Sequence, residues 1–280
     1  MSKLLVANWK MNPLTEGGAI KLAKASDKKG VVVCPPFVFL EAVGKVLKRA
    51  ELGAQDVFWG KGAFTPLEIS RSKRLSPSRQ KRESGFLTGF TGEVSVKELK
   101  TLGVKYVILG HSERRIKMGE TDEMVNKKVI AALKAGLKVI LCVGEPTRGK
   151  MRNERGQTRK FAKQFVKNQL QKDLKSLGPK AYALMPRLII AYEPVWAIST
   201  NKNAKNDTPE DAAEMIKFIK QVLAPKAYVL APKVLYGGSV SAKTIGGFLK
   251  QKEIDGFLVG GASLRPQEFG RIIKIAQKDW

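Results

Sequence analysis

Several polar or glycine-rich segments follow short apolar runs, and their side chains are of types that transfer protons and bind phosphate. A glutamate base, a histidine that donates a hydrogen bond and a lysine cation suit proton abstraction next to a carbonyl. Paired glycines that open helices present backbone N–H groups to an anion. Together these types predict proton transfer on a phosphorylated carbonyl compound. They stand at Asn8, Lys10, His111, Glu193, Gly237-Gly238-Ser239 and Gly260-Gly261.

Each of these residues also has a purely structural interpretation. A lone histidine is more often hydrogen-bonded within a fold than catalytic, although His111 stands beside Ser112 and Glu113. A glutamate after a strand is usually a surface charge, but Glu193 is flanked by the apolar runs Ile-Ile-Ala-Tyr and Pro-Val-Trp-Ala-Ile. Paired glycines are usually turns. The set therefore forms a site only if the fold brings its members together.

The alternation of short apolar runs with longer amphipathic segments predicts a fold of that kind. Parallel strands joined by crossover helices give this pattern. The eight expected strands are Leu4–Ala7, Val31–Cys34, Leu52–Val57, Val104–Leu109, Val139–Val143, Leu188–Tyr192, Val234–Tyr236 and Phe257–Val259. Segments with helical spacing include Phe37–Ala50, Glu120–Ala135, Arg159–Leu177, Pro209–Leu223 and Pro266–Ala276. Before one of them, Thr208 is a capping residue followed by proline.

Among α/β folds, a closed (β/α)8 barrel needs eight such units in about 250 residues. The chain of 280 residues suffices for one such barrel as a single domain, 1–280. An open, doubly wound sheet is the alternative. It normally has a glycine-rich turn after its first strand, where this chain has Asn8-Trp9-Lys10-Met11-Asn12. The barrel is favoured, and the carboxyl ends of its strands would gather the reactive residues at one mouth.

The composition argues against several classes of protein. With one histidine and two distant cysteines, Cys34 and Cys142, the chain has no pattern for a zinc or iron–sulfur site and no disulfide scaffold. No apolar run approaches the roughly 18 residues of a membrane span, and Asn8 comes too early for a signal peptide. We therefore expect a cytoplasmic protein in a reducing compartment, without a metal and without membrane contact.

The charge is the most unusual feature of the composition: 51 Lys and Arg against 25 Asp and Glu, a net charge of +26. Half of this excess lies in residues 66–90 and 148–180, which carry +4 and +9. A solvated charged surface explains both stretches. The alternative is a side function in binding nucleic acid or another polyanion. The basic cluster at 71–82 lacks interleaved aromatic residues and any nucleic-acid motif, so we do not expect a nucleic-acid partner.

Several segments, in the same order, resemble the triosephosphate isomerase family over essentially the whole chain. They are Ala7–Asn12, Gly53–Gln55, Gly110–Arg115, Cys142–Glu145, Ala191–Ile198, Tyr236–Val240 and Asp255–Leu264. The resemblance implies a TIM barrel that interconverts dihydroxyacetone phosphate and D-glyceraldehyde 3-phosphate through an enediolate. It further implies a step of glycolysis and gluconeogenesis, no cofactor, and a homodimer.

The resemblance also implies a role for each matching residue. Glu193 matches the base and His111 the neutral electrophile that polarises the carbonyl, a pairing for which this family is itself the standard example. Lys10 matches a cation that faces the substrate. Matches to substrate-binding positions are Asn8, Lys10, Ser199, Ser239, Gly260 and Gly261. Matches to supporting positions are Glu113, which accompanies the lysine, Ser112 and Tyr236.

Two loops depart from the family's pattern near the expected site. The expected lid, Pro194–Ala204, has Ser199 and Asn201 where glycines are usual, and Lys205-Asn206-Asp207 are added after it. Serine can still offer its backbone N–H to phosphate, but it lacks the access of glycine to positive φ. The loop at 145–150 is longer and more basic than usual, which we interpret as surface variation.

A basic insertion at about 66–90 is the third departure. Phe64-Thr65 and Phe90-Thr91 both resemble the tip of the third βα loop, so the inserted residues lie within that loop. In the family this loop enters the partner subunit beside its Asn/Lys pair. The resemblance therefore predicts a homodimer in which Thr91 lies near the partner's site.

Overall fold

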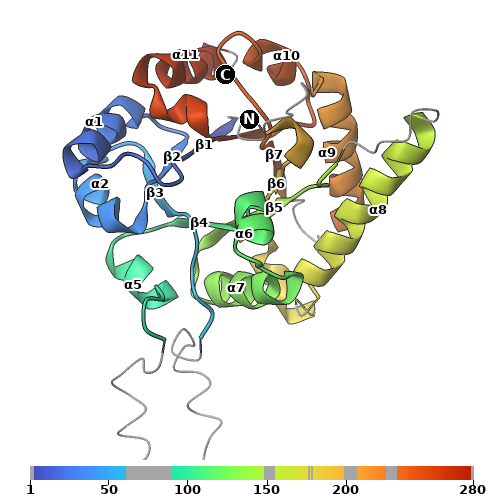
Figure 1. The fold of residues 1–280 in the computed structure, drawn as a ribbon, viewed down its shortest axis with the longest axis horizontal. Coiled ribbons are helices and arrows are strands. Elements are labelled where there is room, and N and C mark those ends of the chain that lie inside the picture. Colours follow the sequence, from blue (N-terminus) through green and yellow to red (C-terminus); the bar gives the residue numbers. More distant parts are fainter. Residues whose placement is uncertain are drawn as a thin grey trace, which may run out of the picture.

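The structure, a computed structural model, describes residues 3–60, 90–147, 155–175, 177, 179–198, 207–224 and 232–278. Its strands form one closed barrel in chain order, β1 to β8, in which every neighbouring pair is parallel. Helices surround the barrel (Figure 1). The predicted (β/α)8 barrel is confirmed, and the open sheet is wrong. The proposed insertion at 66–90 lies, apart from Phe90, outside the described residues.

All eight predicted strands are present, although some of their ends differ from the prediction. The strands are β1 (Leu4–Asn8), β2 (Val31–Cys34), β3 (Glu51–Ala54), β4 (Tyr106–Leu109), β5 (Lys138–Val143), β6 (Leu188–Tyr192), β7 (Lys233–Tyr236) and β8 (Gly256–Val259). The third ends three residues earlier than the predicted Leu52–Val57. There the side chain of Gln55 donates to two backbone carbonyl oxygens of other segments, and Asp56 pairs with Lys128.

The main helices follow the predicted spacing. They are α1 (Glu16–Ser26), α2 (Leu40–Val46), α5 (Val96–Thr101), α6 (Ser112–Lys117), α7 (Asp122–Lys134), α8 (Arg155–Asp173), α9 (Pro209–Leu223), α10 (Ile245–Leu249) and α11 (Pro266–Lys278). The 3-10 segments are the short η1 (Phe37–Phe39), η4 (Val195–Ala197) and η6 (Gly261–Leu264) and the longer η3 (Pro179–Arg187). The predicted helix Phe37–Ala50 is too long, because Leu47 is extended and Asp27 Oδ1 accepts the N–H groups of residues 48–50.

Side-chain caps fix several helix starts as the sequence suggests. Thr208 accepts a hydrogen bond from the N–H of Asp211 before Pro209 opens α9. Ser95 and Glu98 form a reciprocal capping box at the start of α5. Such caps satisfy N–H groups that have no partner within the helix, and each is worth about 1 kcal/mol.

The strands are buried on both faces, which explains why they read as continuous apolar runs. In β1, Leu4 and Val6 belong to a small cluster formed only by strand residues, whereas Leu5 and Ala7 pack in the large cluster that includes the helices. This alternation places one set inside the barrel and the other beneath the helices. No helix in the described part of the chain is both long and apolar enough to cross a membrane.

The barrel closes where β8 meets β1, and a glycine permits the contact. Leu4 pairs with Gly256 and Leu5 with Phe257. A Cβ atom at Gly256 would lie 2.0 Å from the carbonyl oxygen of Leu4, so any larger residue would force the two strands apart. Closure brings the carboxyl end of β8, with Gly260 and Gly261, next to Asn8 and the segment after β1.

Candidate active site

The predicted site residues converge on one cavity. A hollow of about 500 Å³ lies at the carboxyl ends of the strands. Its lining includes the predicted residues Asn8, Lys10, His111, Glu193, Ser239, Gly260 and Gly261. Ser199 and the lid beyond Ile198 lie outside the described residues. The sequence predicted that these residues would meet if the chain forms a barrel, and those that the structure describes do meet.

Glu193 lies at the end of β6 and is only 2% exposed. Its Oε1 is 3.1 Å from Nε2 of His111, and its Oε2 accepts the backbone N–H of Ser112 at 3.0 Å. A buried carboxylate without hydrogen-bond donors would be costly. The Ser112 N–H of the β4–α6 connection therefore holds this carboxylate beside His111, and the supporting role expected of Ser112 belongs to its backbone.

The hydrogen bonds of His111 fix its tautomer. His111 is the N-cap residue of α6, and its Nδ1 accepts the backbone N–H of Glu113 at 3.2 Å. A nitrogen that accepts this hydrogen bond carries no proton, so the ring proton lies on Nε2. The protonated Nε2 then faces Glu193, with Oε1 at 3.1 Å.

Lys10 has a strained backbone, which neighbouring side chains hold. Its φ of 54° is in the left-handed region, a conformation that costs a residue other than glycine about 1 kcal/mol or more. Asn8 Oδ1 accepts the N–H of Lys10 at 3.1 Å. Gln55 Nε2 donates to the carbonyl oxygen of Lys10 at 2.8 Å and to that of Cys34 at 2.9 Å. These three bonds aim the lysine side chain into the cavity.

The ammonium group of Lys10 is paired with the carboxylate of Glu113, as the resemblance implied. Nζ lies 2.8 Å from Oε1. Partial burial works against the charged form of Glu113, but the hydrogen bond and charge of Lys10 outweigh it, so the pKa of Glu113 lies below its ordinary value. The pair links the segment after β1 to helix α6, whose first residue, Ser112, donates its N–H to Glu193.

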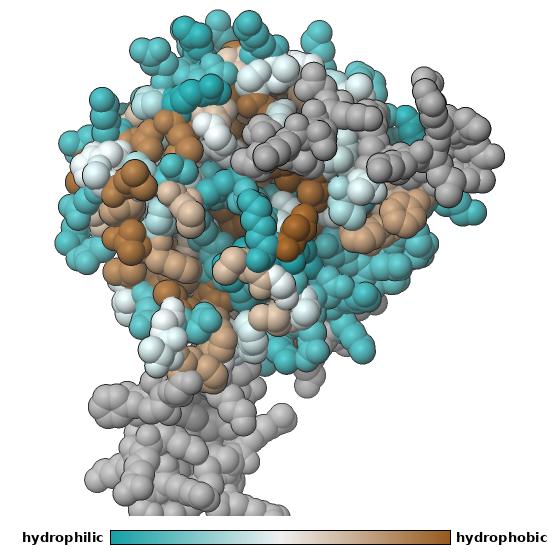
Figure 2. Space-filling model, in the orientation of Figure 1, coloured by the Kyte–Doolittle hydropathy of each residue, from teal (hydrophilic) through white to brown (hydrophobic). Residues whose placement is uncertain are grey.

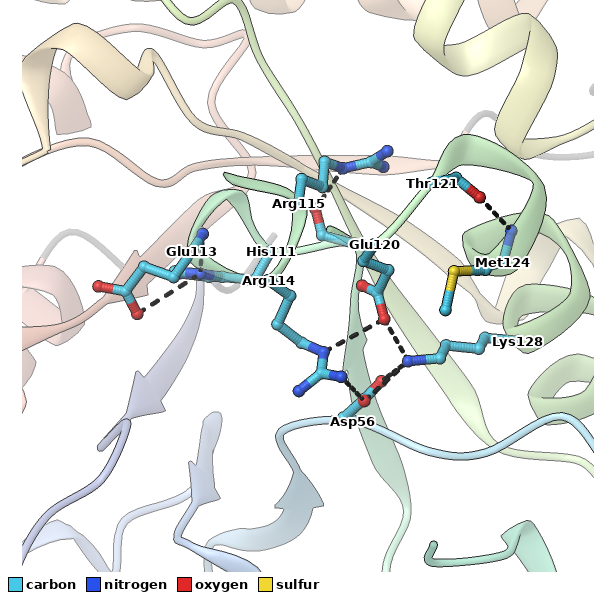
Figure 3. Close-up of polar contacts among 10 residues, drawn as sticks. Asp56, His111, Glu113, Arg114, Arg115, Glu120, Thr121, Met124 and Lys128 are labelled. Atoms are coloured by element: carbon cyan, nitrogen blue, oxygen red, sulfur yellow. Dashed lines mark hydrogen bonds and ion pairs between the residues drawn. The ribbon is translucent and has the colours of Figure 1, made fainter. Parts of the chain in front are cut away.

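Beneath α6 lies a buried ionic cluster that joins it to α7 and to the segment after β3 (Figure 3). Arg114 contacts Asp56 at 2.8 Å and Glu120 at 3.2 Å, and Lys128 pairs with both of these carboxylates. Burial raises the pKa of Asp56, although both cations act in the opposite direction. Because the charges balance, the cluster fixes the position of α6 without adding net charge beneath the site.

Two glycines provide the space that Glu193 occupies. A Cβ atom at Gly144 would lie 1.8 Å from the carbonyl oxygen of Glu193, and one at Gly237 would lie 2.9 Å from its Cγ. At Gly238 a Cβ would lie 2.2 Å from the hydroxyl of Tyr236. Tyr236 is buried and stacks on Phe248 with ring centroids 4.4 Å apart. Its expected supporting role is therefore beneath the glycine turn, and its side chain does not line the cavity.

The interpretation of residues 145–150 as surface variation is wrong at Glu145, which is 2% exposed. Its Oε1 accepts hydrogen bonds from the hydroxyl of Tyr192 at 3.0 Å and from Nε1 of Trp196 at 2.6 Å. Burial raises its pKa, although these two donors act in the opposite direction. Ser239 Oγ donates to the carbonyl oxygen of Ala197 at 2.8 Å. These contacts hold the first turn of the expected lid against two neighbouring loops.

Sequence reasoning missed some residues of the site. Gln55 was part of a matching segment, but nothing in its type or spacing indicated that it holds Lys10. Glu145 carried a signal, since it follows the apolar run of β5 after one glycine, much as Glu193 follows that of β6. Arg265 also lines the cavity. Within the described residues, no three His, Cys, Asp or Glu side chains gather as metal ligands would.

Comparisons with known proteins agree with this geometry. The family model described as triosephosphate isomerase matches residues 3–73 and 78–276. The triosephosphate isomerase of Caldanaerobacter subterraneus subsp. tengcongensis is 41% identical over 282 residues, covering 96% of this chain and 98% of that protein. Those of Dictyoglomus thermophilum and Aquifex aeolicus are 38% and 36% identical, covering 97% and 98% of this chain and 98% and 99% of their own. The chain belongs to the triosephosphate isomerase family.

Proposed function

We propose that the protein interconverts dihydroxyacetone phosphate and D-glyceraldehyde 3-phosphate. The observation that carries the proposal is the meeting of Glu193, His111 and Lys10 in one cavity with the glycine turns after β7 and β8. A carboxylate, a neutral hydrogen-bond donor and a cation are the groups required to move a proton between two carbons beside an oxygen. Membership of the triosephosphate isomerase family supports the same reaction.

In the proposed mechanism, Glu193 removes a proton from the carbon next to the carbonyl and returns it to the neighbouring carbon. The negative charge that develops on oxygen in the enediolate is stabilised by the Nε2–H of His111 and by the ammonium group of Lys10. Asn8 and its neighbours hold Lys10 in position. Nε2 of His111 gives its proton to the former carbonyl oxygen and takes the proton of the neighbouring hydroxyl group, so the imidazole is neutral again at the end of the reaction.

The carboxylate of Glu193 has to exchange partners when substrate binds. Its Oε2 accepts the N–H of Ser112, and its Oε1 lies 3.1 Å from the same Nε2 of His111 that the substrate oxygen requires. A substrate carbonyl that accepts from Nε2 displaces the carboxylate from that donor. The freed base then turns toward the substrate carbon, while Glu145 and Ser239 hold the start of the lid.

The phosphate group of the substrate is proposed to bind at the turns after β7 and β8. Ser239, Gly260 and Gly261 line this end of the cavity. Backbone N–H groups of such turns bind phosphate without a metal ion. We also propose that the backbone N–H of Ser199, in the lid, donates to the phosphate. This proposal rests only on the match of Ser199 to a substrate-binding position of the family.

We propose that the active form is a homodimer. Large apolar residues are exposed on the connections that follow β1, β2, β3 and β4, namely Met11, Leu14, Val38, Phe90, Ile116 and Met118. Figure 2 shows apolar surface gathered over the part of the barrel near α1 and α2. Contiguous exposed apolar surface marks a protein interface. Thr91, exposed next to Phe90, would then lie at the partner's site.

The proposed reaction belongs to glycolysis and gluconeogenesis, and we propose that the protein works in the cytoplasm. Both cysteines, Cys34 and Cys142, are buried free thiols. Burial raises the pKa of each thiol, which keeps it in the unreactive protonated form. Such thiols suit a reducing compartment.

Changing the proposed base tests the reaction directly. Glu193→Asp withdraws the carboxylate by one methylene, about 1.5 Å, and we expect kcat to fall by about 10²- to 10³-fold. Glu193→Gln removes the basic oxygen, and a loss of about 10³-fold or more is expected. A coupled assay on the purified variants measures both. Glu51→Gln, at the exposed amino end of β3, is the control. Wild-type turnover no better than background would end the proposal.

Gln55→Leu keeps the volume of the side chain and removes both hydrogen bonds that it donates. Lys10 then loses part of the support for its left-handed backbone, and we expect kcat/KM to fall by about tenfold. Gln277→Leu is the matched control, because it also removes a bond from an amide to a backbone carbonyl, that of Lys29, but on the outside of the barrel. Equal kinetic losses in the two variants would contradict the role assigned to Gln55.

A charge in the exposed apolar patch tests the homodimer. We expect the wild-type mass by light scattering to be twice the 30.8 kDa of one chain. Val38→Glu should shift the mass toward a single chain, because a buried unpaired carboxylate is costly. Phe161→Glu replaces another exposed apolar side chain, on α8, and should leave the mass unchanged. A wild-type mass of one chain would disprove the homodimer.

A further inference from the structure

One of the positively charged residues that line the cavity has no carboxylate paired with it. Within the described chain, the charged lining residues are Lys10, Glu193 and Arg265. The ammonium group of Lys10 is paired with Glu113, so these two charges cancel. Glu193 accepts a backbone N–H and lies 3.1 Å from the imidazole of His111, and neither contact is with a lysine or an arginine. Among the described lining residues, Arg265 is therefore the cation that remains available to an incoming anion.

Arg265 stands where it can meet an incoming anion. It follows η6, directly after the Gly260-Gly261 turn, and precedes α11. Its backbone is fixed, because its N–H donates to the carbonyl oxygen of Ala262 and its own carbonyl oxygen accepts the N–H of Phe269. Its side chain is exposed at the rim of the cavity. Among the described residues, no carboxylate lies within ion-pair distance of its guanidinium.

We propose that Arg265 is a substrate-binding residue that captures the phosphate dianion and so selects phosphorylated over neutral substrates. This inference rests on the proposed function. A guanidinium presents paired N–H donors that match phosphate oxygens, and it stays charged at every physiological pH. Without Arg265, the charged residues of the described lining would be Glu193 and Lys10, and Lys10 is already paired with Glu113, whereas the substrate carries two negative charges.

The position of Arg265 also determines which step it affects. It lies at the rim beside the turn of Gly260 and Gly261, whereas Glu193 and His111 act on the carbon end of the substrate. A contact made equally with bound substrate and transition state strengthens binding and leaves the chemical step unchanged. Arg265 therefore acts on KM, and screening by salt weakens the part of its effect that comes from attraction over a distance.

The test compares Arg265→Gln with Arg271→Gln. Both remove one positive charge, and Arg271 lies on α11 outside the cavity lining. For Arg265→Gln we expect KM for D-glyceraldehyde 3-phosphate to rise about fivefold at low salt, with kcat within twofold of wild type. The KM ratio should shrink as salt is added. Arg265→Lys should recover part of the loss, since it restores the charge but not the planar pair of donors.

Two further readouts separate this inference from the proposed function. Binding of inorganic phosphate, measured by calorimetry, should weaken about fivefold in Arg265→Gln and stay unchanged in Arg271→Gln. Turnover of phosphate-free D-glyceraldehyde should be the same in both variants. Unchanged phosphate affinity in Arg265→Gln, or an equal loss with the phosphate-free aldehyde, would overturn the role of Arg265. Absence of wild-type turnover would instead contradict the proposed function, and calorimetry would still test Arg265.

Discussion

The site depends on a buried carboxylate whose partners are neutral. Glu193 is almost completely removed from water; its carboxylate accepts the backbone N–H of Ser112, contacts the thiol of Cys142 and lies beside the imidazole of His111. Stabilising a buried charge with a cation would lock it into an ion pair that is costly to break. Neutral donors satisfy its oxygens while leaving it free to exchange one partner for substrate. A base that has to move is thereby compatible with a closely packed site.

Two of the neighbouring cations are balanced by other carboxylates. Lys10 is paired with Glu113, and Arg114 is held in the ionic cluster beneath α6. Helix α6 is central to this arrangement, because its first residues supply the N–H groups that orient both His111 and Glu193. The large positive net charge of the chain says little about the reaction. The pairing of individual cations determines the electrostatic surroundings of the base.

The barrel could be predicted because its strands are buried on both faces and recur at regular spacing. The catalytic set could be predicted because strand ends in a parallel barrel meet at one mouth, and family resemblance then assigned the roles. Gln55 and Glu145 could not be assigned from spacing, since their roles depend on contacts with segments that are distant in sequence. Some predicted ends of helices and strands were wrong for the same reason. Asp27, far from α2 in sequence, binds the N–H groups at which the helix was expected to continue.

The neutrality of His111 is the central claim, and the composition makes it directly measurable. His111 is the single histidine of the chain, so the imidazole ¹⁵N spectrum reports on this site alone. The hydrogen bond from Glu113 to Nδ1 fixes which nitrogen bears the proton. At about pH 7 we predict a protonated Nε2 and an unprotonated Nδ1, the tautomer that can donate to Glu193 or to substrate. Protonation of both nitrogens, or a proton on Nδ1 alone, would contradict the mechanism.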